Sequence, residues 1–105
     1  DPTTAFQAAV TMNRLGYPEP ATRLLQQLEA KVGNSPGFWM QLQMAAHDSR
    51  QVDVLIEASR RLYELTPRNP VAANNYAASL LLRPDRAAEA VQATFEVLNQ
   101  QPQSV

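Results

Sequence analysis

The sequence contains no cysteine, three glycines and one histidine among its 105 residues. The absence of cysteine excludes disulfides, thiolate nucleophiles and cysteine-ligated metal ions. The glycines, at positions 16, 33 and 37, do not form a phosphate-binding loop. Acidic residues are scattered along the chain, and we interpret them as a solvated surface, since nothing suggests the paired carboxylates of a hydrolase. We therefore expect no enzymatic activity, no cofactor and no bound metal ion.

The one histidine, His47, is followed directly by Asp48. A metal site needs several ligands, and a nucleophile needs a base within reach. Neighbouring residues on a helix do not face each other, so we do not expect these two side chains to act together. The pattern favours a polar surface or groove residue near a helix end.

Charge and long apolar runs are also scarce. The net charge is −1, so we expect no general attraction to nucleic acid. No apolar run approaches the ~20 residues of a membrane-spanning helix, so we expect no membrane insertion. Hydrophobic residues make up 45% of the chain, which is typical of a folded domain. A cysteine-free chain suits the cytoplasm and the periplasm alike, so the composition leaves the compartment open.

Proline recurs with a period of 34 residues, at Pro2, Pro36 and Pro70. Each of these prolines follows a residue that favours a helix N-cap: Asp1, Ser35 and Asn69. The cap side chain accepts a backbone N–H that would otherwise be unpaired, and a proline at the first helical position has no N–H to lose. The period predicts three repeated units, at about residues 1–34, 35–68 and 69–102, within one domain over 1–105.

Each proline opens an apolar segment with helical periodicity, over residues 2–15, 36–47 and 70–82, and a second such segment follows in every unit. The alternation with period two that is typical of strands is absent from these segments. We therefore predict an all-α fold of six antiparallel helices. One helix pair cannot bury its own apolar face, so neighbouring units must stack.

This register resembles that of the tetratricopeptide-repeat family across essentially the whole chain. Counted from the proline, position 4 favours tryptophan in that family and position 8 favours a small residue. The residues at position 4 are Ala5, Trp39 and Ala73, and those at position 8 are Ala9, Gln43 and Ala77. The family's closing proline matches Pro67 and, with one residue inserted near Pro84, also Pro102. The resemblance implies a right-handed α-solenoid of three helix–turn–helix repeats; the pentatricopeptide class, with RNA as its ligand, is the alternative.

In the tetratricopeptide family, the first helix of each unit lines a concave groove. The resemblance implies that the groove residues of this chain are Phe6, Val10, Asn13, Met40, Met44, His47, Asn74 and Ala78. Four of them are large and apolar and would form a stripe, in which flexible methionine suits a surface that adapts to its partner. The alternative is that these apolar residues belong to the core and are covered by a neighbouring helix.

The last predicted helix leaves an apolar end. Only three residues follow Pro102, so Val91, Phe95 and Leu98 would be exposed as an end-docking face. Large exposed apolar patches usually mark a contact. Because the chain also starts at Asp1 without a signal sequence, we interpret it as a fragment of a longer protein. Either further repeats follow in that parent chain, or this end pairs with another copy as a homodimer.

These observations predict a non-catalytic interaction or scaffold module of a larger, bacterial protein. It would bind a peptide or protein partner through its groove or through the ends of the stack. Two alternatives remain open: a purely structural spacer or self-association module, and an RNA-binding helical repeat.

Overall fold

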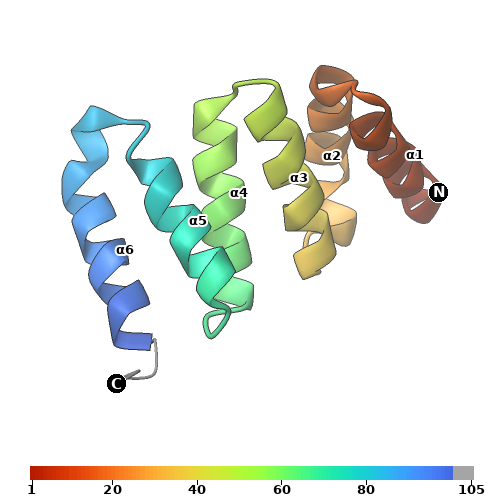
Figure 1. The fold of residues 1–105 in the computed structure, drawn as a ribbon. Coiled ribbons are helices and arrows are strands. Elements are labelled where there is room, and N and C mark those ends of the chain that lie inside the picture. The colour runs from red at the N-terminus through yellow and green to blue at the C-terminus, as the bar shows by residue number, and fades with distance from the viewer. Residues whose placement is uncertain (101–105) are drawn as a thin grey trace.

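The computed structural model describes residues 1–100, and within this range it contains six α-helices and no strand. This confirms the predicted all-α class and the number of helices (Figure 1). The predicted closing residue Pro102 lies outside the described residues. The elements are α1 (Pro2–Leu15), α2 (Pro18–Val32), α3 (Pro36–Asp48), α4 (Val52–Leu65), α5 (Pro70–Leu80), the 3-10 turn η1 (Pro84–Arg86) and α6 (Ala87–Gln100).

The starts of α1, α3 and α5 are capped as predicted. The Asp1 carboxylate accepts a hydrogen bond from the backbone N–H of Thr4 at 2.8 Å. Ser35 and Asn69 accept backbone N–H groups in the first turns of α3 and α5 in the same way. Each cap therefore satisfies donors that have no partner inside the helix.

The helix ends differ slightly from the prediction. The helix α3 continues to Asp48, one residue beyond the predicted end. The helix α5 ends at Leu80, two residues before the predicted end. There the backbone N–H groups of Leu81 and Leu82 bond to carbonyls three residues earlier, which tightens the last turn. Arg83 precedes Pro84, and a residue before proline avoids the helical conformation. The helix is therefore expected to end before this point.

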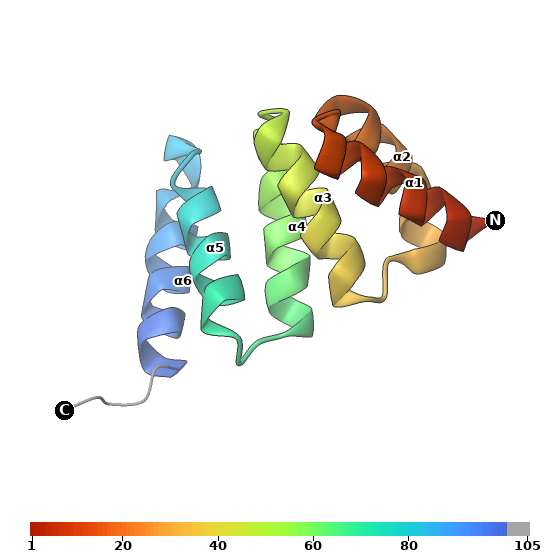
Figure 2. The same cartoon turned by 45° about the vertical axis from the view of Figure 1, so that its right-hand side comes forward.

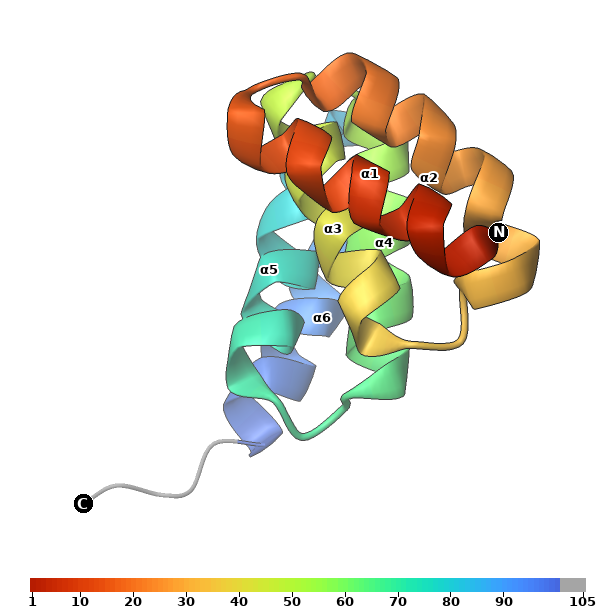
Figure 3. The same ribbon diagram turned by 90° about the vertical axis from the view of Figure 1, so that its right-hand side faces the viewer.

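Helices that follow one another in the chain pack against each other. Each pair of one unit is in contact (α1 with α2, α3 with α4, α5 with α6), and α2 and α4 also pack on the first helix of the next pair. The pairs follow one another across the molecule, with α1 and α6 on opposite sides (Figures 1 and 2). Figure 3 shows the α1–α2 pair inclined to the pairs behind it. No helix within residues 1–100 is long and apolar enough to cross a membrane.

Most of the buried apolar residues within residues 1–100 form two clusters. The first joins α1 to α5 around Phe38, Trp39 and Leu42, which are almost completely buried. The indole N–H of Trp39 donates to the backbone oxygen of Gly33 at 2.7 Å. The second cluster joins α4, α5 and α6, and its members are Ile56, Ala77, Leu80, Ala90 and Ala93. The helices α4 and α5 contribute to both clusters and therefore link the two halves of the molecule.

Candidate functional site

Two methionines on α3 are exposed although they are large and apolar. Met40 is 54% exposed and Met44 is 47% exposed. They are one helical turn apart, so their side chains lie on the same face of α3. Neither is part of the core, which excludes the core interpretation for these two residues. Phe6 and Val10 on α1 are half-buried, and Phe6 packs against the first core cluster.

The helices that carry this apolar surface are fastened to each other. The Asn13 side-chain N–H group donates to the backbone oxygen of Gln41 at 3.0 Å and to its side-chain oxygen at 2.9 Å. Asn13 was predicted as a groove residue, and in the structure it joins α1 to α3. These two bonds join the helices that carry Val10 and Met44.

A cavity of about 380 Å³ lies at the starts of α1 and α3. Its apolar wall includes the rings of Phe6 and Phe38, whose centroids are 6.4 Å apart. The lining residues are Thr3, Phe6, Val32, Asn34, Ser35 and Phe38. An apolar lining with a few polar groups is typical of a pocket that takes one apolar side chain. Phe6 among these residues was predicted as a groove residue.

The predicted groove residues do not all lie on helices that are in contact. The helix α1 packs directly on α3, whereas α5 makes no comparable contact with α3. Asn74 and Ala78 lie on α5 and are exposed, as is His47 on α3. The surface that the contacts support most directly is therefore the part on α1 and α3. We call it the α1–α3 surface, and it consists of Phe6, Val10, Met40, Met44 and the cavity beside Phe38.

The prediction that His47 and Asp48 do not face each other was wrong. The ring Nδ1 of His47 lies 3.2 Å from a carboxylate oxygen of Asp48. Both residues are in the last turn of α3 and are exposed, so their side chains can rotate through the solvent toward each other. An exposed pair of this kind contributes little to stability. It has no buried environment that would make it a catalytic pair.

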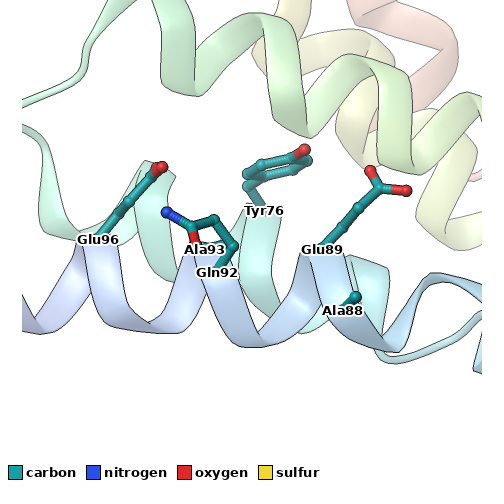
Figure 4. Close-up of a pocket in the computed structure, with 6 residues that line it drawn as sticks. All are labelled: Tyr76, Ala88, Glu89, Gln92, Ala93 and Glu96. Atoms are coloured by element: carbon teal, nitrogen blue, oxygen red, sulfur yellow. The ribbon is translucent and has the colours of Figure 1, made fainter.

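A second cavity, of about 310 Å³, lies beside α6 (Figure 4). The figure shows the Tyr76 ring from α5 and the side chains of Glu89 and Glu96 from α6 extending to the same side. Tyr63 on α4 stacks on Tyr76 with centroids 5.8 Å apart, and its hydroxyl donates to Glu96 at 2.8 Å. No sequence pattern predicted this arrangement.

The carboxylates beside this second cavity already have partners. Glu89 forms an ion pair with Arg86 at 2.6 Å, and the hydrogen bond from this guanidinium lowers the pKa of Glu89. Burial raises the pKa of Tyr76, and the nearby charge of Glu89 raises it further. The arrangement links α4, α5 and α6, and we interpret it as a structural junction.

The end-docking residues are all on α6 and all exposed: Val91, Phe95 and Leu98. The apolar residues that the sequence predicted at the surface of α3 and of α6 are thus exposed. The sequence matches no protein-family model and no curated protein.

Proposed function

We propose that this chain is a three-repeat segment of a right-handed α-solenoid similar to the tetratricopeptide repeat, and that it binds a peptide or protein segment on the α1–α3 surface. Three capped helix starts at a 34-residue period support the repeat. The packing of each helix on its neighbours in the chain supports the stacked arrangement.

The exposure of Met40 and Met44 carries the proposal. Burying a methionine side chain contributes roughly 1.5–3 kcal/mol, so leaving two of them open forgoes stability that a core position would give. Exposed apolar patches of this kind usually mark a contact surface. Methionine also adapts its shape to different partners, because its side chain is unbranched and flexible.

The shape of the α1–α3 surface indicates the chemistry of the partner. Met40 and Met44 would contact apolar side chains spaced one turn apart on an amphipathic helix, or alternate side chains of an extended segment. The cavity beside Phe6 and Phe38 would take one larger apolar anchor. We therefore expect a partner segment with two or three apolar side chains on one face.

The RNA-binding alternative receives less support from the charges. Arg60 is bonded to Glu57 and Glu64 on its own helix, and the Arg61 guanidinium lies over the Trp39 ring at 5.2 Å from its centroid. These arginines are therefore engaged within the protein. RNA binding would require free positive charge along the groove and would weaken steeply with salt.

Selection of peptides from a displayed library tests the proposed function. Peptides selected on the wild-type chain should carry apolar anchors and should bind the double variant Met40→Glu/Met44→Glu at least about tenfold more weakly, since about 1.4 kcal/mol corresponds to that factor. The variant should remain folded because both positions are exposed.

The double variant Leu81→Glu/Leu82→Glu is the matched control, because it places the same charges on two exposed leucines away from α1 and α3. It should bind the selected peptides like the wild type. Equal binding by the Met40→Glu/Met44→Glu variant would contradict the proposal.

A further inference from the structure

The helices α4 and α6 are equivalent elements, 35 residues apart. Both contain 14 residues, from Val52 to Leu65 and from Ala87 to Gln100. The same positions are buried on both helices. These positions are Leu55, Ala58 and Leu62 on α4 and Ala90, Ala93 and Val97 on α6.

A second face of α4 is covered by the next pair of helices. Ile56 on this face is only 2% exposed and belongs to a buried cluster with Ala77 and Leu80 of α5. Tyr63, two turns further along α4, stacks on Tyr76 of α5. The helix α5 therefore covers this face of α4.

The same face of α6 is exposed. The residues equivalent to Ile56 and Tyr63 are Val91 and Leu98, which are 56% and 58% exposed. Thr94, the equivalent of the buried Ser59, is also exposed. The helix α6 thus displays the apolar face that α4 buries against α5.

At the opposite end of the molecule, α1 exposes three positions whose equivalents on α3 are buried. On α3 the residues Phe38, Leu42 and Ala45 are buried. The residues 34 positions earlier on α1 are Thr4, Ala8 and Thr11, and all three are exposed. Leu15, at the end of α1, extends this uncovered face and is also exposed.

From these two uncovered halves we infer that a second copy of this chain docks end to end, with the α6 face of one copy on the α1 face of the next. The contact continues the α4–α5 junction, whose equivalent positions are already buried inside the chain. The six residues that define the two faces are uncharged: Thr4, Ala8 and Thr11 on α1, and Val91, Thr94 and Leu98 on α6. Small side chains on α1 let the bulkier α6 side chains approach closely.

Such a contact joins two different surfaces, so it does not close after two copies and extends into longer arrays. This distinguishes it from a symmetric dimer in which α6 packs on α6. The inference depends on the repeat register and not on the α1–α3 surface. Peptide binding by Met40 and Met44 can therefore fail while end-to-end docking holds, and the reverse is also possible.

Sedimentation equilibrium of two charge variants tests the inference. One variant, Ala8→Glu/Thr11→Glu, blocks the α1 end, and the other, Val91→Glu/Leu98→Glu, blocks the α6 end. The wild type should rise in mass with concentration above the 11.6 kDa of one chain. Each variant alone should lose this rise. An equimolar mixture should form a 1:1 complex, because each variant supplies the end that the other lacks.

Circular dichroism should confirm that both variants fold. If either does not fold, the milder substitutions Ala8→Gln and Val91→Gln replace the glutamate substitutions. The variant Leu81→Glu/Leu82→Glu should associate like the wild type. A wild type that stays monomeric at every concentration overturns the inference. Self-association of the Ala8→Glu/Thr11→Glu variant, which would mean that α6 pairs with α6, also overturns it, and so does a mixture that stays monomeric.

Discussion

Trp39 lies at the centre of the first core cluster. Its ring packs edge-on against Phe38 with centroids 4.8 Å apart, and its indole N–H is bonded to the backbone of Gly33. Trp39→Ala should destabilise the fold by roughly 3–5 kcal/mol, because it removes a buried aromatic side chain and leaves a cavity. Urea denaturation measures this loss.

The variant Trp39→Phe serves as its control, because it keeps an aromatic ring and loses the N–H bond. It should therefore cost less than the alanine variant. An unchanged denaturation curve for Trp39→Ala would mean that the ring does not support the core.

Within residues 1–100, two residues have left-handed backbone conformations, Gly16 with φ of 88° and Arg50 with φ of 61°. This conformation costs an L-residue with a side chain roughly 1–2 kcal/mol, and glycine adopts it without that cost. Arg50→Gly should therefore raise the free energy of unfolding by about 0.5–1 kcal/mol, after the loss of chain entropy that glycine brings.

The matched substitution Gly16→Ala should have the opposite sign and destabilise by about 1 kcal/mol. An added Cβ at Gly16 would meet no atom within 4 Å, so its effect comes from the backbone alone. Thermal denaturation of both variants is the measurement, and shifts of the same sign would contradict the assigned conformations.

At the scale of the elements, helix starts were more predictable than helix ends. An N-cap followed by proline is a local signal, and it identified the first residues of α1, α3 and α5 correctly. The end of α5 depends on how the chain turns toward Pro84. Leu81 and Leu82 continue the apolar pattern, so the sequence predicted a helix two residues longer than the one in the structure. The predicted insertion near Pro84 agrees with the offset of 35 residues between α4 and α6.

The sites were predictable to a smaller extent. Helical spacing and the family resemblance predicted Met40, Met44 and the three α6 residues as surface residues. All of them are exposed in the structure. The cavity beside Phe38 and the bond from Tyr63 to Glu96 depend on the distances between helices far apart in the chain. A sequence pattern contains no such distance. The contact of His47 with Asp48 depends on side-chain rotation, which helical spacing does not determine.

The junction of α4, α5 and α6 should respond to alkaline pH. Burial raises the pKa of Tyr76 above its ordinary value of 10.0, so the folded chain holds this proton to higher pH than the unfolded chain. The stabilisation that comes from this difference in pKa is therefore complete below pH 10, and it is lost as the pH rises through the folded-state pKa of Tyr76. Between about pH 9 and pH 11, Tyr76→Phe should lose less stability than the wild type.

Urea denaturation of the wild type and of Tyr76→Phe across this pH range tests the prediction. Parallel stability curves would show that Tyr76 does not differ in pKa between the folded and unfolded chains. The phenylalanine ring should preserve the stacking on Tyr63.

The whole molecule is longer in one direction, with extents of 47, 27 and 24 Å and a radius of gyration of 14.4 Å. A compact domain of 100 residues has a radius of gyration of about 13 Å. The greater length follows from packing in which each helix mainly contacts its neighbours in the chain. This arrangement leaves a long side surface, which carries Met40 and Met44, and two end surfaces on α1 and α6.

The most direct test of binding on the α1–α3 surface is an NMR titration that follows the methyl groups of methionine. The chain contains three methionines, and Met12 is half-buried against the core while Met40 and Met44 are exposed. When a peptide from the displayed library is added to protein labelled at these methyl groups, we predict that the Met40 and Met44 signals shift and that the Met12 signal stays in place. A bound peptide that leaves the Met40 and Met44 signals unchanged would contradict the account.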